Sequence, residues 1–108
     1  MALSSVASGT QTATVTTEHT LATQTAAGWY TLVVDTVNMV ADDVLILKFK
    51  TKCLTGGVSR LAYQAMFAHV QEEQIKYSVP VPIDIELVVT LTQSEGTSRD
   101  FPWSLLKS

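Results

Sequence analysis

The sequence predicts an all-β protein, a single-domain β-sandwich or jelly-roll-like barrel of about seven or eight antiparallel strands. Runs of alternating apolar and polar residues recur along its 108 residues, and many are rich in Thr and Val. The clearest run is 83–91, in which every second residue is Ile, Leu or Val, with Asp84, Glu86 and Thr90 among those between. Successive side chains of a strand point to opposite faces, so this run has one apolar face and one mostly polar face.

The N-terminal residues 1–10 are small and polar, with few apolar side chains to hold them against a core. We therefore expect a flexible arm there, whose removal leaves the fold intact, and a single β domain over 11–108. The threonine-rich stretch that follows predicts strands near 11–18 and 19–25, because β-branched threonine suits a half-exposed sheet.

A central strand is predicted over 29–36 and a further strand over 43–54, joined by a polar connection. In the second strand, apolar residues alternate with three lysines, which we interpret as a solvated face that guards an edge strand against pairing. These lysines are Lys48, Lys50 and Lys52. The lone cysteine, Cys53, continues the apolar face of this strand and is predicted to be a small buried residue.

The stretch 59–73 is compatible with both a helix and a strand. A serine at its start and several alanines suit a helix, but the preceding Gly-Gly turn favours a hairpin, so we predict a strand. Two prolines in 76–82 remove backbone donors and predict an edge or an extended crossing segment. A further strand is predicted over 83–93, and the apolar tail at 101–106 is expected to be anchored to the domain.

Composition excludes several classes of partner. The net charge is −3, with seven Lys and Arg against ten acids, whereas a nucleic-acid-binding protein needs a basic field. One cysteine cannot form an intramolecular disulfide. The N-terminal residues do not have the pattern of a signal peptide and no long apolar stretch occurs, so we expect synthesis in the cytoplasm and no membrane partner. Charged residues are only 16%, which suggests that a partner covers part of the surface.

No catalytic, cofactor-binding or metal-binding constellation is recognisable, and we predict a non-enzymatic protein without a cofactor. His19 and His69 have no second metal ligand at a suitable spacing, and His69 lies on the apolar phase of its strand. Asp84 and Glu86 would lie about 7 Å apart by the strand rise, a separation that a glycosidase pair could have. The same spacing arises in any half-buried strand whose alternate positions are polar, so we interpret the two acids as part of a solvated face.

The residues predicted to contact a partner lie late in the chain. Trp103, near the C-terminus, is the aromatic residue most suited to an interface, with core packing as its alternative role. The candidate interface consists of Trp103, Phe101, Tyr77, Pro80 and Pro82. Symmetric self-association, as a homo-oligomer (dimer or trimer), is also expected.

Four stretches carry a family resemblance. They are Thr-Glu-His-Thr-Leu at 17–21, Gly-Trp-Tyr-Thr-Leu-Val-Val-Asp at 28–35, the segment 45–69 with its Gly-Gly turn, and Tyr-Ser-Val-Pro-Val-Pro at 77–82 followed by the Phe-Pro-Trp-Ser-Leu-Leu tail. Together they cover most of 15–107. In these stretches the chain resembles small β-rich proteins encoded among the head genes of tailed bacteriophages, of the capsid cement or decoration type.

The resemblance implies a virion structural protein on the capsid surface. Its partner would be the major capsid protein lattice, which it would stabilise at the joints between subunits. A head–tail connector or tail structural protein is the nearest alternative. An alternative of another class is a small carbohydrate- or ligand-binding β-sandwich, whose exposed aromatic residues would form a platform.

Overall fold

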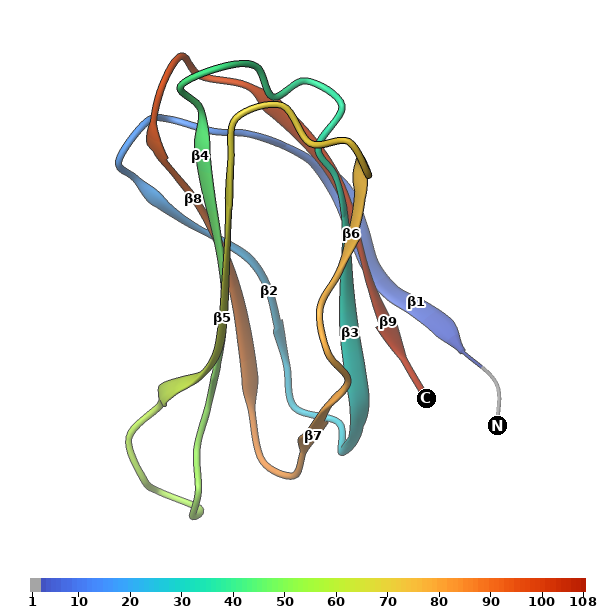
Figure 1. Cartoon of the computed structure of the whole chain (residues 1–108). Helices are drawn as coiled ribbons and strands as arrows, with labels where there is room; N and C mark the ends of the chain where they lie inside the picture. Colours follow the sequence, from blue (N-terminus) through green and yellow to red (C-terminus); the bar gives the residue numbers. More distant parts are fainter. Residues whose placement is uncertain (1–2) are drawn as a thin grey trace.

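Two antiparallel sheets face each other in the computed structural model, which describes residues 3–108 (Figure 1). The described residues form nine strands and no helix, which confirms the predicted all-β sandwich. The strands are β1 (Ser4–Thr12), β2 (Glu18–Gln24), β3 (Gly28–Asp35), β4 (Val44–Thr51), β5 (Arg60–Ala68), β6 (Ile75–Tyr77), β7 (Val81–Ile83), β8 (Leu87–Glu95) and β9 (Asp100–Lys107).

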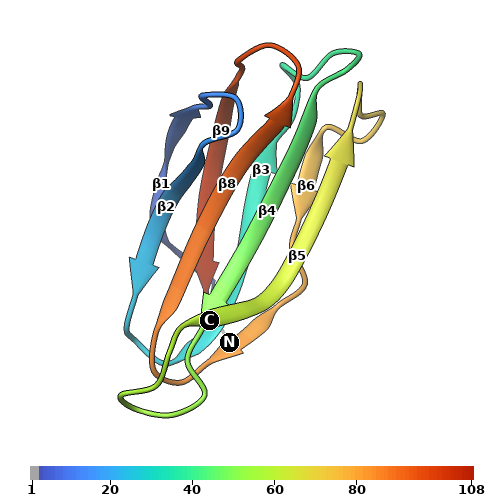
Figure 2. The same cartoon turned by 90° about the vertical axis from the view of Figure 1, so that its left-hand side faces the viewer.

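The five-stranded sheet has the order β1-β9-β3-β6, with β7 also paired to β3, and the four-stranded sheet has the order β2-β8-β4-β5. Figure 2 shows the four-stranded sheet in front, with β1 behind β2 and β6 behind β5. The chain crosses repeatedly between the sheets, and only β4 and β5 form a hairpin of consecutive strands within the four-stranded sheet. One side of the sandwich is therefore formed by the edges β1 and β2, and the other side by β5, β6 and β7.

The core lies between the sheets and is built from the alternating apolar residues of four strands. Their side chains are at most 4% exposed, so each strand gives one full face to the interior. The central core residues are Tyr30, Leu32 and Val34 of β3, Leu45, Leu47 and Phe49 of β4, Leu87, Val89 and Leu91 of β8, and Phe101 and Leu105 of β9. The buried phases predicted for the residues of β4 and for 87–91 are confirmed.

The predicted strand over 83–93 is in fact two strands in different sheets. Ile83 ends β7 in the five-stranded sheet, and β8 begins at Leu87 in the four-stranded sheet. Both residues are buried in the same core, at 4% and 0% exposure. Because the two strands point their apolar residues at one shared interior, the alternation continues across the crossing and conceals it.

The prediction of a flexible arm over 1–10 is wrong for the part that the structure describes. Residues 4–12 form β1, which pairs along its whole length with β9, while residues 1–2 lie outside the described residues. A strand near 11–18 is also wrong, because residues 13–17 cross between the sheets and bury Ala13 on the way. Only Ala7 of β1 packs against the core cluster, so backbone pairing, which leaves no apolar pattern, accounts for the strand.

The strand β5 and the edge segment at 76–82 lie where the sequence predicts them, but the lysines of β4 have another role. The ambiguous stretch 59–73 contains the strand β5, as predicted, and β6 and β7 pair only with β3, which confirms the edge assignment of 76–82. The interpretation of the lysines as an edge guard is wrong, because β4 lies between β8 and β5. Lys50 instead pairs with Glu18 at 2.9 Å, and Lys52 with Glu86 at 3.8 Å.

Candidate docking face

The strand β3 contributes alternate side chains to the outer face of the five-stranded sheet. Because Tyr30, Leu32 and Val34 point into the core, their neighbours Trp29, Thr31 and Val33 point outward. Trp29, the second residue of β3, is 51% exposed, although three of the residues that follow it in the strand are buried. A large indole in this position is available for contact with a partner.

The edge strands β6 and β7 extend this face. Tyr77 lies directly opposite Val33, and Pro82 lies directly opposite Trp29, so both share the outward side of β3. Tyr77 is 66% exposed, and Pro80 and Pro82 are exposed as well. The two prolines have no backbone N–H, which keeps this edge from pairing with a foreign strand while its side chains stay available.

An open hollow of about 440 Å³ lies on the same side of the molecule. It is lined by Leu3, Trp29, Thr31, Pro80 and Ser108. The C-terminal residue is held beside the indole, because the Ser108 N–H donates to the Trp29 carbonyl at 3.0 Å. The hollow therefore lies between Leu3, Ser108, the outward side of β3 and the segment that joins β6 to β7.

We call the exposed apolar residues on and beside this side of the five-stranded sheet the apolar face. It consists of Leu3, Trp29, Ile75, Tyr77, Val79, Pro80 and Pro82. The charged residues Asp35 and Asp100 lie toward one end of this outer surface, since Asp35 ends β3 and Asp100 begins the antiparallel strand β9. The amine of Lys76 lies 5.2 Å from the centre of the Phe67 ring, and Phe67 packs against the core, so this charge is directed inward.

The outer face of the four-stranded sheet differs in character. Glu18 accepts a hydrogen bond from the Thr90 hydroxyl at 2.7 Å and forms its ion pair with Lys50 across β8. These contacts lower the pKa of Glu18, the Thr90 hydrogen bond most and the Lys50 bond next. Met66 and Leu61, 64% and 53% exposed on the edge strand β5, are the large exposed apolar residues of this face. The two outer faces are thus distinguished by charge.

The structure separates the five predicted interface residues. Tyr77, Pro80 and Pro82 lie together on the apolar face. Phe101 is fully buried, so its assignment to an interface is wrong. Trp103 lies opposite the buried Val34 and packs against the core cluster, which is its alternative role.

Trp29 is the large exposed aromatic residue of this face that is not among the five residues predicted to contact a partner. Residues 29–34 are apolar or β-branched in both phases, so the alternation does not show which side is covered. The pairing of Trp29 with Pro82, which places the indole on the outer side beside the edge strand, depends on the sheet order and gives no local signal in the sequence.

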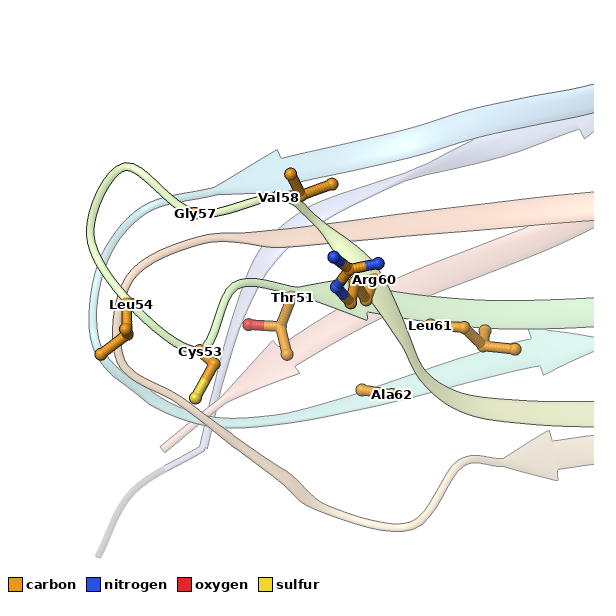
Figure 3. A pocket seen from close by; sticks show the side chains of 8 residues that line it. All are labelled: Thr51, Cys53, Leu54, Gly57, Val58, Arg60, Leu61 and Ala62. Carbon is orange, nitrogen blue, oxygen red and sulfur yellow. The ribbon is translucent and has the colours of Figure 1, made fainter.

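A second hollow, of about 390 Å³, lies at the loop between β4 and β5 (Figure 3). Its lining residues are Thr51, Cys53, Leu54, Gly57, Val58, Arg60, Leu61 and Ala62. Cys53 is exposed in this loop rather than buried, because β4 ends at Thr51 and the alternation stops there. The predicted buried role of Cys53 is therefore wrong.

A buried polar cluster closes the opposite end of the sandwich. The carboxylate of Asp43, 1% exposed, accepts hydrogen bonds from the Val40 N–H at 2.9 Å and the Thr97 N–H at 3.2 Å. The Arg99 Nε donates to it at 2.9 Å, and the Gln93 amide at 3.4 Å. Burial alone would raise the pKa of Asp43, but these donors and the Arg99 charge together hold that pKa below its ordinary value of 3.8. The cluster joins the 36–43 connection to the β8–β9 loop and is structural.

The two histidines support turns through their ring nitrogens. His19 Nε2 accepts the Thr14 N–H at 2.9 Å, and His69 Nδ1 accepts the Asp42 N–H at 3.0 Å. Across residues 3–108, no three His, Cys, Asp or Glu residues are grouped so that they could hold a metal ion. In the same part of the chain, no helix is long and apolar enough to cross a membrane.

Comparison of the chain with protein-family models, with curated proteins and with solved structures finds no match.

Proposed function

We propose that this protein is a non-enzymatic structural protein of a virion, which binds through its apolar face to the outside of a phage capsid at the joints between major capsid subunits. The proposal is supported by the sequence resemblance to capsid cement proteins and by the β-sandwich fold. The observation that carries it is the contrast between the two outer faces. One bears ion pairs, whereas the other exposes Trp29 and Tyr77 among prolines and aliphatic side chains.

The apolar face has the composition of a docking surface. Exposed apolar side chains that are grouped on one face, rather than scattered, mark interaction sites in soluble proteins. Aromatic residues at the centre of an interface carry most of the binding free energy, and Trp and Tyr are the most frequent among them. The expected complementary surface on the shell is apolar and carries no uncompensated charge, because a charge buried against Trp29 would lose its hydration.

Binding of this kind stabilises an assembled shell by mass action. A ligand that binds only the assembled lattice shifts the equilibrium toward that lattice. Repeated copies on one shell increase the stabilisation without any single contact being strong. Because many copies act on one shell, the apolar face of each copy needs only modest affinity for the capsid subunits.

The proposal is tested with intact particles produced from the genome that encodes this chain. We expect the protein to copurify with them in many copies, and Tyr77→Asp to bind stripped particles at least about thirtyfold more weakly, as loss of about 2 kcal/mol implies. The matched control is Met66→Asp on the other outer face, because Met66 and Tyr77 are 64% and 66% exposed on edge strands. Equal binding by both variants would refute docking through the apolar face.

The two alternative functions, a connector or tail protein and a carbohydrate-binding module, predict different results. A head–tail connector or tail protein would be present as a single ring of copies per particle. A carbohydrate-binding module is favoured by the exposure of Trp29 and Tyr77 on one face, and it would bind a glycan array with loss of binding in Trp29→Ser. Absence of the chain from particles, together with Trp29-dependent glycan binding, would replace the capsid proposal.

A further inference from the structure

We propose that the free edge of β1 pairs antiparallel with β1 of a second copy of this chain, so that two five-stranded sheets join into one continuous sheet. This inference rests on the backbone and on the sequence of β1. It does not depend on the capsid proposal, which concerns the apolar face.

The strand β1 is the last strand on its side of the five-stranded sheet. It pairs with β9 from Ser4 opposite Lys107 to Thr12 opposite Asp100, and no described strand pairs with its other side (Figure 2). A strand paired on one side leaves every second N–H and C=O directed away from the sheet. A nine-residue edge of this kind is a template for another extended strand.

Apart from the register irregularity between Ser5 and Ala7, β1 lacks the usual protection of such an edge. Residues Ser4–Thr12 read Ser-Ser-Val-Ala-Ser-Gly-Thr-Gln-Thr and include neither a charged residue nor a proline. The other edges are shorter or guarded. The edge strands β6 and β7 have three residues each, with Pro82 in β7, while β2 carries the paired Glu18 and β5 begins with Arg60.

A second copy of β1 is the occupant that best fits this edge. Antiparallel pairing of two identical strands opposes no like charges in any register, because β1 has no charge. In the register centred on Ser8, Val6 lies opposite Thr10 and Ser5 opposite Gln11, so no two bulky side chains face one another. Small residues lose little rotamer freedom when they are ordered. The same pairing draws the exposed Val6, 36% accessible, toward an interface.

The experiment measures the mass of the full chain by analytical ultracentrifugation over a range of concentrations. We expect the wild-type chain of 11.7 kDa to approach twice this mass as its concentration rises. The variant Ser8→Lys/Thr10→Lys places two charges on the edge and is expected to stay monomeric. The matched control is Gln64→Lys/Met66→Lys, two exposed residues at the same spacing on the edge strand β5, and it is expected to remain dimeric.

Amide hydrogen exchange of the wild-type chain gives a second measurement that needs no variant. We expect alternate β1 amides to exchange more slowly at high concentration than at low concentration, and β5 amides to show no such change. A wild-type chain that stays monomeric, a dimer that survives the β1 lysines, or dissociation by the β5 lysines would each overturn the proposal. The variant Tyr77→Asp should still dimerise, so a failed capsid assay leaves this result interpretable.

Discussion

Removal of the Asp43 carboxylate is the most informative single perturbation of the fold. In Asp43→Ala, the N–H groups of Val40 and Thr97 lose their acceptor, and the Arg99 guanidinium loses its counter-charge. Gln93, which is fully buried, also loses one of its acceptors. The cluster is the junction between two connections that are remote in sequence, so its loss affects both sheets.

The size of the effect follows from how far each partner can reach water. Removal of one member of a buried ion pair costs about 3–5 kcal/mol. The Arg99 side chain is 28% exposed and can recover part of its hydration, so we expect the lower limit, about 3 kcal/mol. For a domain with about 5–15 kcal/mol of total stability, this is a decrease in Tm of about 10–15 °C.

The assay is thermal and urea unfolding followed by circular dichroism, with Lys52→Ala as the control. Lys52 pairs with Glu86 at 3.8 Å, and both side chains are about a quarter exposed. Such a surface pair is worth at most about 1 kcal/mol, so the control should lose little stability. A loss below about 1 kcal/mol in Asp43→Ala would refute the reasoning about the cluster.

The same carboxylate predicts how stability changes with acid. The pKa of Asp43 in the folded protein lies below its ordinary value of 3.8, so between these two values the unfolded chain binds more protons. The contribution of Asp43 is therefore complete above 3.8 and is lost as the pH falls toward the folded pKa. The wild-type Tm should decrease in this window, and the decrease should be shallower in Asp43→Asn. Parallel pH profiles for the two proteins would contradict this assignment.

Three further predictions concern the backbone and the core. Gly96 has a φ of +95°, and an added Cβ would collide with the Asp43 carboxylate, so Gly96→Ala should lose about 3 kcal/mol in urea unfolding. Gly56→Ala, where φ is +79° and the space is open, should lose only about 1 kcal/mol, and equal losses would contradict the predicted collision. Leu87→Asp places a charge at a fully buried position and should abolish the cooperative unfolding transition; a folded, cooperative variant would disprove its strand phase. Deletion of 1–12 removes β1 and uncovers the edge of β9, so its Tm should fall, and an unchanged Tm would restore the arm interpretation.

The core strands were predictable because one phase of each is apolar. In β4 and in 87–91, every second residue is apolar, and the structure buries these residues. A strand that is half covered imposes this pattern on its sequence, since each exposed apolar side chain forgoes the free energy of burial.

The errors occurred where backbone pairing, rather than side-chain burial, determines the structure. The strand β1 has no apolar phase, because it contacts β9 through main-chain pairs and polar side-chain hydrogen bonds, and only Ala7 reaches the core. The crossing at 84–86 is concealed because the strands on both sides point into one interior. The strand β1 therefore leaves no periodic signal in the sequence, and the crossing does not interrupt the one that surrounds it.

The candidate site was predictable in part. Tyr77, Pro80 and Pro82 were identified because prolines restrict a segment to an edge. The assignment of Phe101 to an interface was wrong. Its alternation with Trp103 and Leu105 shows that the three side chains share one side of a strand, but it does not show that this side is buried. Which side of that strand is covered depends on the sheet order, and the sheet order cannot be read from local periodicity.

Electron cryomicroscopy of the native particle tests docking through the apolar face most directly. The account predicts density for this sandwich in repeated copies over the joints of the shell, with Trp29 and Tyr77 of each copy against the capsid subunits. Density in which the lysine-bearing face of the four-stranded sheet contacts the shell, while Trp29 and Tyr77 point to solvent, would contradict it.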